Sequence, residues 1–228
     1  MLLEKIVFVG RETLYFPPHV ADLLPKIKKT PLAALPYPVA LPMYIENPWP
    51  QLFENALKMT QSASLSFATC DLCDAHKNDT LGVFQVLPPV FTDFGGIRKF
   101  SGPVATVKCF EDNSLVKAAV DSPGEGRVLV VDGGASLRRA LLGGNLGAAA
   151  ARNGWAGVVI DGCVRDVAEL ARCDIGIRAL AAMPLPTEKR QQGQRDMAIQ
   201  VQGLWIRPGD WLYADEDGMV VMASPLTA

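Results

Sequence analysis

The chain has 228 residues, of which 49% are hydrophobic and 20% are charged, and its formal net charge is −2 at pH 7. A chain of this length and apolar content can bury one sizeable core. The slight negative charge is not the basic excess of a nucleic-acid-binding protein, so we expect no direct nucleic-acid partner. No apolar run in the sequence approaches the roughly 20 residues of a membrane helix. We therefore expect a cytoplasmic protein without membrane attachment.

Residues 1–50 differ in composition from the rest, and we predict an N-terminal proline-rich extension followed by one domain over residues 51–228. A short strand is predicted at Ile6–Val9 and a helix at His19–Lys28. The run PLAALPYPVALPMYIENPWP is then too dense in proline for a regular helix. We interpret it as an arm that wraps its own domain or a neighbouring subunit. A proline-rich ligand for another protein is the alternative.

Five cysteines, an odd number, favour reduced thiols over a disulfide framework. Two of them form the spacing Cys70-x-x-Cys73 within TCDLCDAH. A zinc or redox site is one interpretation, but no second Cys/His pair follows at zinc-finger spacing. We favour a helix that carries Cys70 and Cys73 on its buried face.

The first half of the domain mixes short helices and strands. A helix is predicted over Gln51–Thr60, and strands are predicted over Gly82–Val90 and Val104–Phe110. The polar run Glu111–Ser114 precedes a helix over Leu115–Val120. This polar run caps the helix or, alternatively, lines a cleft.

A strand–helix–strand unit follows and predicts the core of the fold. Arg127–Asp132 is the strongest strand pattern; helices are predicted around Leu137–Leu142 and from near Asn145, and a second apolar strand spans Ala156–Ile160. This order predicts a parallel strand pair with a right-handed crossover. The glycines after Asp132 lack the G-x-G-x-x-G spacing, so we reject a dinucleotide-binding site.

The last third of the domain reads as strands and turns. A strand is predicted over Ile175–Ala182 and a charged loop over Thr187–Asp196. Short strands then alternate with Gly/Asp turns from Met197 to Met222, which predicts an antiparallel β module. The predicted fold class is therefore α/β, with a mixed sheet that combines a parallel βαβ core and an antiparallel β module, preceded by an N-terminal arm.

The candidate site lies at the end of the second strand of the βαβ unit. Arg165-Asp166 places a fixed cation beside a carboxylate there, and α/β proteins place their chemistry at such strand ends. A helix that begins near Asn145 presents unpaired backbone N–H groups and a positive dipole end, which suit a small carboxylate. Together these features can hold a 2-oxo acid and stabilise its enolate. An ion pair that merely closes a turn is the alternative.

The same part of the chain resembles a known family. The phrases are TCDLCDA, DFGG, FSGPVATVKCFEDNSLVKAA, GRVLVVDGG, SLRRALL, NGWAGVVIDGCVRD and RPGDWLYADEDG. They resemble the regulators of ribonuclease activity A (RraA) and the class II 4-hydroxy-4-methyl-2-oxoglutarate aldolases. The resemblance implies a β/β/α swivelling-type domain and a ring-shaped homotrimer, sometimes a hexamer, with active sites at the subunit seams.

The resemblance also implies roles for single residues. In the aldolase branch, the Arg of the Arg-Asp pair binds pyruvate and the Asp binds Mg²⁺ or Mn²⁺, which implies these roles for Arg165 and Asp166. Oxygen ligands suit these two metals better than zinc. A four-residue backbone segment that begins 22 residues before the Arg binds the substrate carboxylate, and it corresponds here to Gly143, Gly144, Asn145 and Leu146.

This chain departs from the aldolase pattern at one position. Many members have an aspartate that orders a metal-bound water where this chain has Gly144, and the adjacent Asn145 cannot accept a proton from water. Asp161 is a candidate substitute. The regulator branch commonly lacks the Asp of the Arg-Asp pair, which this chain retains as Asp166.

We therefore expect a divalent-metal-dependent lyase that cleaves 4-hydroxy-4-methyl-2-oxoglutarate-type acids to pyruvate. Oxaloacetate would lose CO₂ through the same pyruvate enolate. The alternative is a non-catalytic regulator that binds and inhibits a ribonuclease or its RNA-helicase partner.

Overall fold

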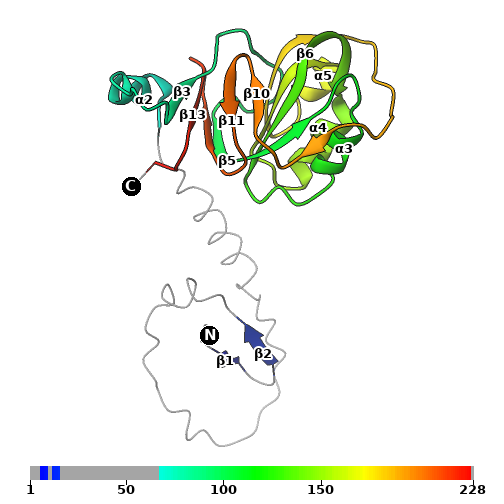
Figure 1. Cartoon of the computed structure of the whole chain (residues 1–228). Helices are drawn as coiled ribbons and strands as arrows, with labels where there is room; N and C mark the ends of the chain where they lie inside the picture. The colour runs from blue at the N-terminus through cyan, green and yellow to red at the C-terminus, as the bar shows by residue number, and fades with distance from the viewer. Residues whose placement is uncertain (1–5, 10–11, 16–66, 227–228) are drawn as a thin grey trace, which may run out of the picture. The chain divides into compact units, whose positions relative to one another are not determined.

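The computed structural model describes residues 6–9, 12–15 and 67–226 (Figure 1). The chain divides into two compact units, Met1–Leu57 and Lys58–Ala228. No helix among the described residues is long and apolar enough to cross a membrane.

In the first unit, the predicted strand at Ile6–Val9 is confirmed as β1, which pairs antiparallel with β2 (Glu12–Tyr15). The helices predicted at His19–Lys28 and Gln51–Thr60 lie outside the described residues, as does the proline-rich run.

The second unit is built on a mixed nine-stranded sheet. Its strands follow one another in the order β3 (Phe84–Val86), β13 (Met219–Met222), β12 (Trp211–Ala214), β5 (Phe100–Lys108), β6 (Val128–Leu142), β7 (Gly157–Val164), β8 (Gly176–Ala182) and β4 (Thr92–Asp93), with β9 (Gln194–Arg195) paired to β5. The four central strands β5 to β8 are parallel, whereas β3, β13, β12, β4 and β9 pair antiparallel. The prediction of a parallel core joined to an antiparallel module is thus confirmed.

Apolar side chains alternate along the parallel strands, so each face of the sheet carries a core. In β6, Leu129 and Val131 belong to the core that also contains residues of the helices α3 (Ser114–Val120), α4 (Gly144–Arg152) and α5 (Val167–Leu170). Val128 and Val130 belong to the opposite core, which the hairpin β10 (Ile199–Val201) and β11 (Leu204–Ile206) covers. Figure 1 shows the helices and this hairpin around the central strands.

The segment with the Cys-x-x-Cys spacing forms the predicted helix, α2 (Thr69–His76). Its buried residues are Thr69 and Leu72, whereas Cys70 is exposed and Cys73 is half-buried, so the prediction that both thiols lie on the buried face is wrong for Cys70. The carboxylate of Asp215 sets this orientation, because it accepts hydrogen bonds from the backbone N–H of Thr69 at 2.7 Å and from its hydroxyl at 2.5 Å.

The helix predicted around Leu137–Leu142 is wrong, because these residues extend β6 to a length of 15 residues. Ala140 is the register partner of Cys163 on β7, and its N–H donates to the carbonyl of Leu185 at 2.8 Å. Shifts in register between β6 and β7 absorb the additional residues. Hydrogen bonds to neighbours on both sides therefore override the helical spacing of the apolar residues.

Other boundaries differ less. The helix predicted over Leu115–Val120 is confirmed as α3, and the strand predicted over Val104–Phe110 begins earlier, as β5. The strand predicted over Gly82–Val90 is limited to the three residues of β3.

Candidate functional site

Arg165 and Asp166 lie at the carboxyl end of β7, where the sequence predicted a turn. The N–H of Arg165 donates to the carbonyl of Leu142 at 2.9 Å, which fixes the turn to the end of β6. Asp166 has φ 58° and ψ 44°, a left-handed conformation that turns the chain into α5. Nε of Arg165 lies 3.5 Å from Oδ2 of Asp166, and the two side chains are 41% and 39% exposed. The cation and the carboxylate are thus adjacent and open to solvent.

The helix start predicted near Asn145 is confirmed, because α4 begins at Gly144 after the extended residue Gly143. The N–H of Gly144 donates to Oδ2 of Asp166 at 3.2 Å. The N–H of Leu146 donates to the carbonyl of Gly143 at 3.0 Å. Asp166 therefore sits at the positive end of the α4 dipole, which favours a negatively charged group there.

A carboxylate that the sequence reading missed completes this group. A Cβ added to Gly144 would lie 1.9 Å from Oε2 of Glu169 and 2.8 Å from its Cδ. The carboxylate of Glu169 thus occupies the space that a side chain at position 144 would fill. A Cβ added to Gly143 would in turn lie 2.7 Å from Oδ2 of Asp166. The two glycines leave room for two carboxylates from α5 and its preceding turn.

The spacing of Asp166 and Glu169 in the sequence could have indicated that the two carboxylates lie close together. Asp166 and Glu169 are three residues apart, and residues at this spacing lie on one face of a helix. The site predicted from the sequence comprised Gly143–Leu146, Arg165 and Asp166, with Asp161 as a candidate substitute, and did not include Glu169.

Asp161 does not join this group in the structure. It lies inside β7, is 4% exposed, and its Oδ1 accepts a hydrogen bond from Nε2 of Gln202 at 2.7 Å. Its register partner on β6 is Asp132. Burial raises the pKa of Asp161, and the charge of Asp132 raises it further, while the Gln202 amide opposes the shift. The structure thus places Asp161 against Gln202 and opposite Asp132, and places Glu169 beside Gly144.

The residues can be tested for their fit to a divalent cation. The described residues contain no group of three or more His, Cys, Asp or Glu side chains arranged to hold a metal ion. Asp166 and Glu169 nevertheless both approach Gly144, one through its N–H and one through the space above it. Mg²⁺ is commonly bound by one or two carboxylates together with waters and substrate oxygens, so this pair fits Mg²⁺ or Mn²⁺.

Comparison with known proteins supplies the family. The family model for RraA-like proteins, described as Aldolase/RraA, matches residues 69–221. A curated relative from Albidiferax ferrireducens is 76% identical over 169 residues, which is 71% of this chain and 98% of the relative. A relative from Burkholderia multivorans is 56% identical over 164 residues, with 72% and 100% covered. Both are named "putative 4-hydroxy-4-methyl-2-oxoglutarate aldolase".

Two solved structures are similar over nearly their whole length. The RNA-processing inhibitor RraA from Thermus thermophilis is 44% identical with a TM-score of 0.67, and the match covers 72% of this chain and 97% of that one. A protein from Geobacillus kaustophilus, named as an S-adenosylmethionine:2-dimethylmenaquinone methyltransferase, is 45% identical with a TM-score of 0.65, and 70% and 97% of the chains are covered. The resemblance read from the sequence is thus confirmed, and the chain belongs to the RraA-like family, Aldolase/RraA.

Proposed function

We propose that this protein is a divalent-metal-dependent lyase that cleaves 4-hydroxy-4-methyl-2-oxoglutarate-type acids and releases pyruvate. The names of the curated relatives support an aldolase. The observation that carries the proposal is the convergence of Arg165, Asp166 and Glu169 on Gly143 and Gly144 at the start of α4. A ribonuclease regulator without catalysis has no need for two carboxylates and an arginine gathered at a helix N-terminus.

In this proposal the carboxylates serve the metal, Arg165 serves the enolate, and the start of α4 serves the substrate carboxylate. Asp166 and Glu169 hold the cation, and a bound Mg²⁺ or Mn²⁺ supplies Lewis-acid polarisation of the 2-oxo group. Arg165 stays protonated and donates hydrogen bonds to the oxygen on which enolate charge develops. The substrate carboxylate binds at the N-terminal end of α4 through the backbone of Asn145, because the N–H of Gly144 already donates to Asp166. Cleavage of the C–C bond then leaves pyruvate enolate, which accepts a proton to become pyruvate.

Glu169 can also take the place of the aspartate that many aldolases have where this chain has Gly144. A general acid–base group must lie within hydrogen-bond reach of the water or hydroxyl whose proton it moves. The Glu169 carboxylate occupies the volume where an aspartate at position 144 would begin. It can therefore orient a water and exchange a proton with it, which neither Gly144 nor Asn145 can do. We propose the same group for the decarboxylation of oxaloacetate, in which the enolate forms by loss of CO₂.

The test is pyruvate release from 4-hydroxy-4-methyl-2-oxoglutarate and from oxaloacetate, with Mg²⁺, Mn²⁺ or EDTA. We expect metal-dependent turnover that falls by at least about a hundredfold in Arg165→Gln, Asp166→Asn and Glu169→Gln. Glu188→Gln is the matched control, because Glu188 is an exposed carboxylate that pairs with Arg139 and Arg190 outside this group. Folded, metal-supplied protein that releases no pyruvate would exclude the lyase.

The second candidate is a regulator that binds and inhibits a ribonuclease or its RNA-helicase partner. The specific support is the 44% identity to a solved structure named as an RNA-processing inhibitor. Inhibition of RNA cleavage by both the wild-type protein and the Asp166→Asn variant would favour this role. Loss of pyruvate release without loss of inhibition would assign both functions to separate surfaces.

A further inference from the structure

We propose that a pocket at the carboxyl end of β5, where β5 lies beside Asp132 of β6, is a second ligand site, which binds a small dicarboxylate through Lys108 in its lining and Arg138 next to it. The pocket has a volume of about 490 Å³, and its lining includes Lys108, Phe110, Asp132 and Gly134. Parallel sheets present their ligand sites at the carboxyl ends of the strands. Within the described residues, the lining contains neither Arg165 nor Asp166, so the pocket is distinct from the proposed catalytic group.

The ammonium group of Lys108 is held in place at the edge of this pocket. Lys108 is the last residue of β5 and the register partner of Asp132 on β6. Its Nζ lies 2.8 Å from Oδ2 of Asp132, whose side chain is 7% exposed, and Oδ1 of Asp132 accepts the N–H of Gly134 at 3.0 Å. An ammonium group has three donors, and the Lys108 side chain is 52% exposed. Two donors of a pre-oriented cation therefore remain for a ligand.

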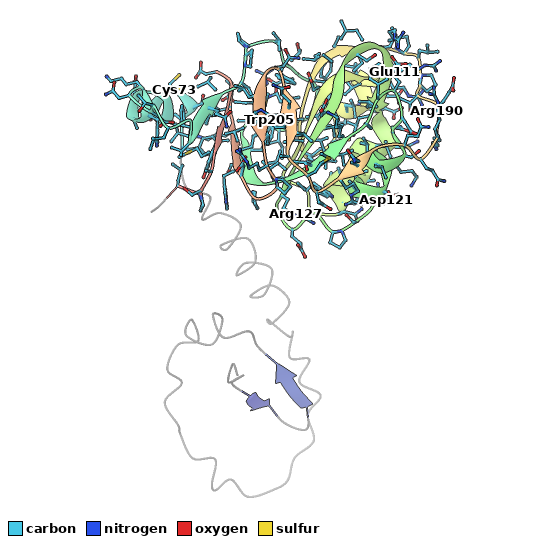
Figure 2. The ribbon with its side chains drawn as sticks, viewed as in Figure 1. Cys73, Glu111, Asp121, Arg127, Arg190 and Trp205 are labelled. Carbon is cyan, nitrogen blue, oxygen red and sulfur yellow. The ribbon has the colours of Figure 1, made fainter. Side chains whose placement is uncertain are left out.

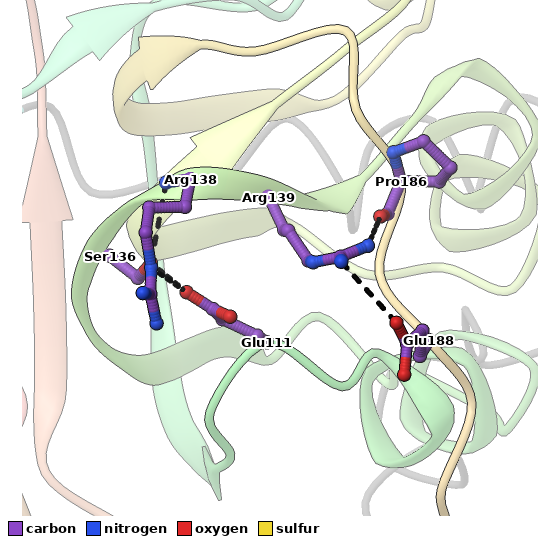
Figure 3. Close-up of polar contacts among 6 residues, drawn as sticks. All are labelled: Glu111, Ser136, Arg138, Arg139, Pro186 and Glu188. Carbon is purple, nitrogen blue, oxygen red and sulfur yellow. Dashed lines mark hydrogen bonds and ion pairs between the residues drawn. The ribbon is translucent and has the colours of Figure 1, made fainter.

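A second cation, Arg138, is not one of the lining residues but lies close to the ring of Phe110, which is one of them. Phe110 is 57% exposed, and the guanidinium carbon of Arg138 lies 5.9 Å from the centre of its ring. Nε of Arg138 donates to Oε1 of Glu111 at 2.7 Å, and Glu111 also accepts the hydroxyl of Ser136 at 2.6 Å (Figure 3). This leaves the two terminal nitrogens of Arg138 for other acceptors, and the side chain is 72% exposed.

The charge expected of the ligand follows from the hydrogen-bond donors and acceptors that remain unused around the pocket. The carboxylates of this region are already committed: Asp132 to Lys108 and the Gly134 N–H, and Glu111 to Ser136 and Arg138. The groups left over are cationic donors, so a ligand must supply anionic acceptors. Lys108 and Phe110 line the same pocket, and Arg138 lies over the Phe110 ring, so this arrangement suits an acid with a carboxylate at each end and a short carbon chain that lies against Phe110. Figure 2 shows the side chain of Glu111 in the part of the second unit that contains β6 and α5, although Glu111 itself is buried.

The experiment is calorimetric titration of the full chain with succinate, an unreactive dicarboxylate, in EDTA and low salt. We expect binding by the wild-type protein, and affinity lower by at least about tenfold in Lys108→Met and in Arg138→Gln. Lys117→Met is the matched control, since Lys117 is an exposed lysine paired with Asp121 on α3 and should bind as the wild type does. Acetate should bind more weakly and succinamide not at all.

The Arg165→Gln variant separates this site from the catalytic group. The proposal requires succinate to bind Arg165→Gln with unchanged affinity. It is overturned if succinate does not bind the wild-type protein, if binding is lost in Arg165→Gln, or if Lys108→Met and Arg138→Gln both bind normally. Lys108→Met leaves Asp132 buried without its cation, so Arg138→Gln, whose partner Glu111 keeps Ser136, provides the decisive result if Lys108→Met fails to fold. None of these measurements depends on turnover.

Discussion

The carboxylate of Glu169 fills the space next to Gly144, so that a Cβ on Gly144 would lie 1.9 Å from Glu169 Oε2. The left-handed conformation of Asp166, at φ 58°, starts α5 in the direction that brings Glu169 there. The acidic partner of this site thus comes from α5 rather than from α4. Glu169 can approach this position only because residue 144 is a glycine, since a larger residue at position 144 and Glu169 cannot share the same volume.

This relationship predicts the outcome of an exchange. Gly144→Asp should displace Glu169 and reduce pyruvate release by at least about tenfold. The double variant Gly144→Asp with Glu169→Gly should recover part of the loss, because the new carboxylate then enters the vacated space. Steady-state kinetics of the two single variants and the double variant form the test. Additive losses in the double variant would show that the two positions do not share one role.

Metal binding should be visible as thermal stabilisation. At a metal concentration one hundred times the Kd, a single site adds about 2.7 kcal/mol to the free energy of unfolding. For a domain of this size that corresponds to a rise in Tm of about 5–10 °C. Asp166→Asn should lose most of the rise with Mg²⁺ or Mn²⁺, whereas Arg165→Gln should keep it. Equal stabilisation of all three proteins would place the metal elsewhere.

Asp112 should make stability depend on pH. It is 1% exposed, and burial alone would raise the pKa of this carboxyl, but backbone N–H groups of Gln192, Ser114 and Arg190 donate to it and lower the pKa to about 2. A pKa depressed in the folded state contributes stability above the unfolded pKa, and this contribution is lost as pH falls towards 2.

From this lowered pKa we expect Asp112 to contribute about 2 kcal/mol to the free energy of unfolding at pH 7. Urea unfolding should show Asp112→Asn to be less stable than the wild type by about that amount at pH 7. The difference should shrink between about pH 5 and pH 2. A difference that is constant with pH would mean that the amide disrupts packing rather than electrostatics.

Arg178 should be a large contributor to stability. Its Nε lies 2.9 Å from Oδ1 of Asp93 as an ion pair without directed hydrogen-bond geometry, and its Nη2 donates to the carbonyl of Asp215. Its side chain is 6% exposed. Arg178→Met should lower the free energy of unfolding by about 3–5 kcal/mol, because it leaves Asp93 and a carbonyl without their partner. Asp93→Asn in the same chain should return part of the loss, measured by urea unfolding.

The resemblance to the RraA-like family also predicts the oligomeric state. We propose a homotrimer, or a hexamer formed from two trimers. Light scattering after size exclusion should give a mass of three or six chains of 24.6 kDa each. A monomer at micromolar concentration, with unchanged pyruvate release, would contradict both the trimer and active sites at subunit seams.

Several features of the fold followed from local patterns. The apolar runs at β6 and β7 predicted neighbouring parallel strands, which the register of Val128 with Gly157 confirms. The glycines before Asn145 predicted the start of α4, and the end of an apolar strand predicted the position of Arg165. These features depend on short-range geometry, since strand alternation and helix capping act within a few residues.

Other features depended on contacts between distant segments. The spacing of Leu137–Leu142 fits a helix as well as a strand, and only pairing with β7 and the chain near Leu185 selected the strand. Cys70 is exposed because Asp215, far along the chain, fixes the rotation of α2. The sequence by itself determined the family, the parallel core and the Arg165-Asp166 turn. Only the tertiary structure placed Glu169 against Gly144 and Asp161 inside β7. Contacts between distant elements arise from packing, and they do not produce a periodic pattern of residues in the sequence.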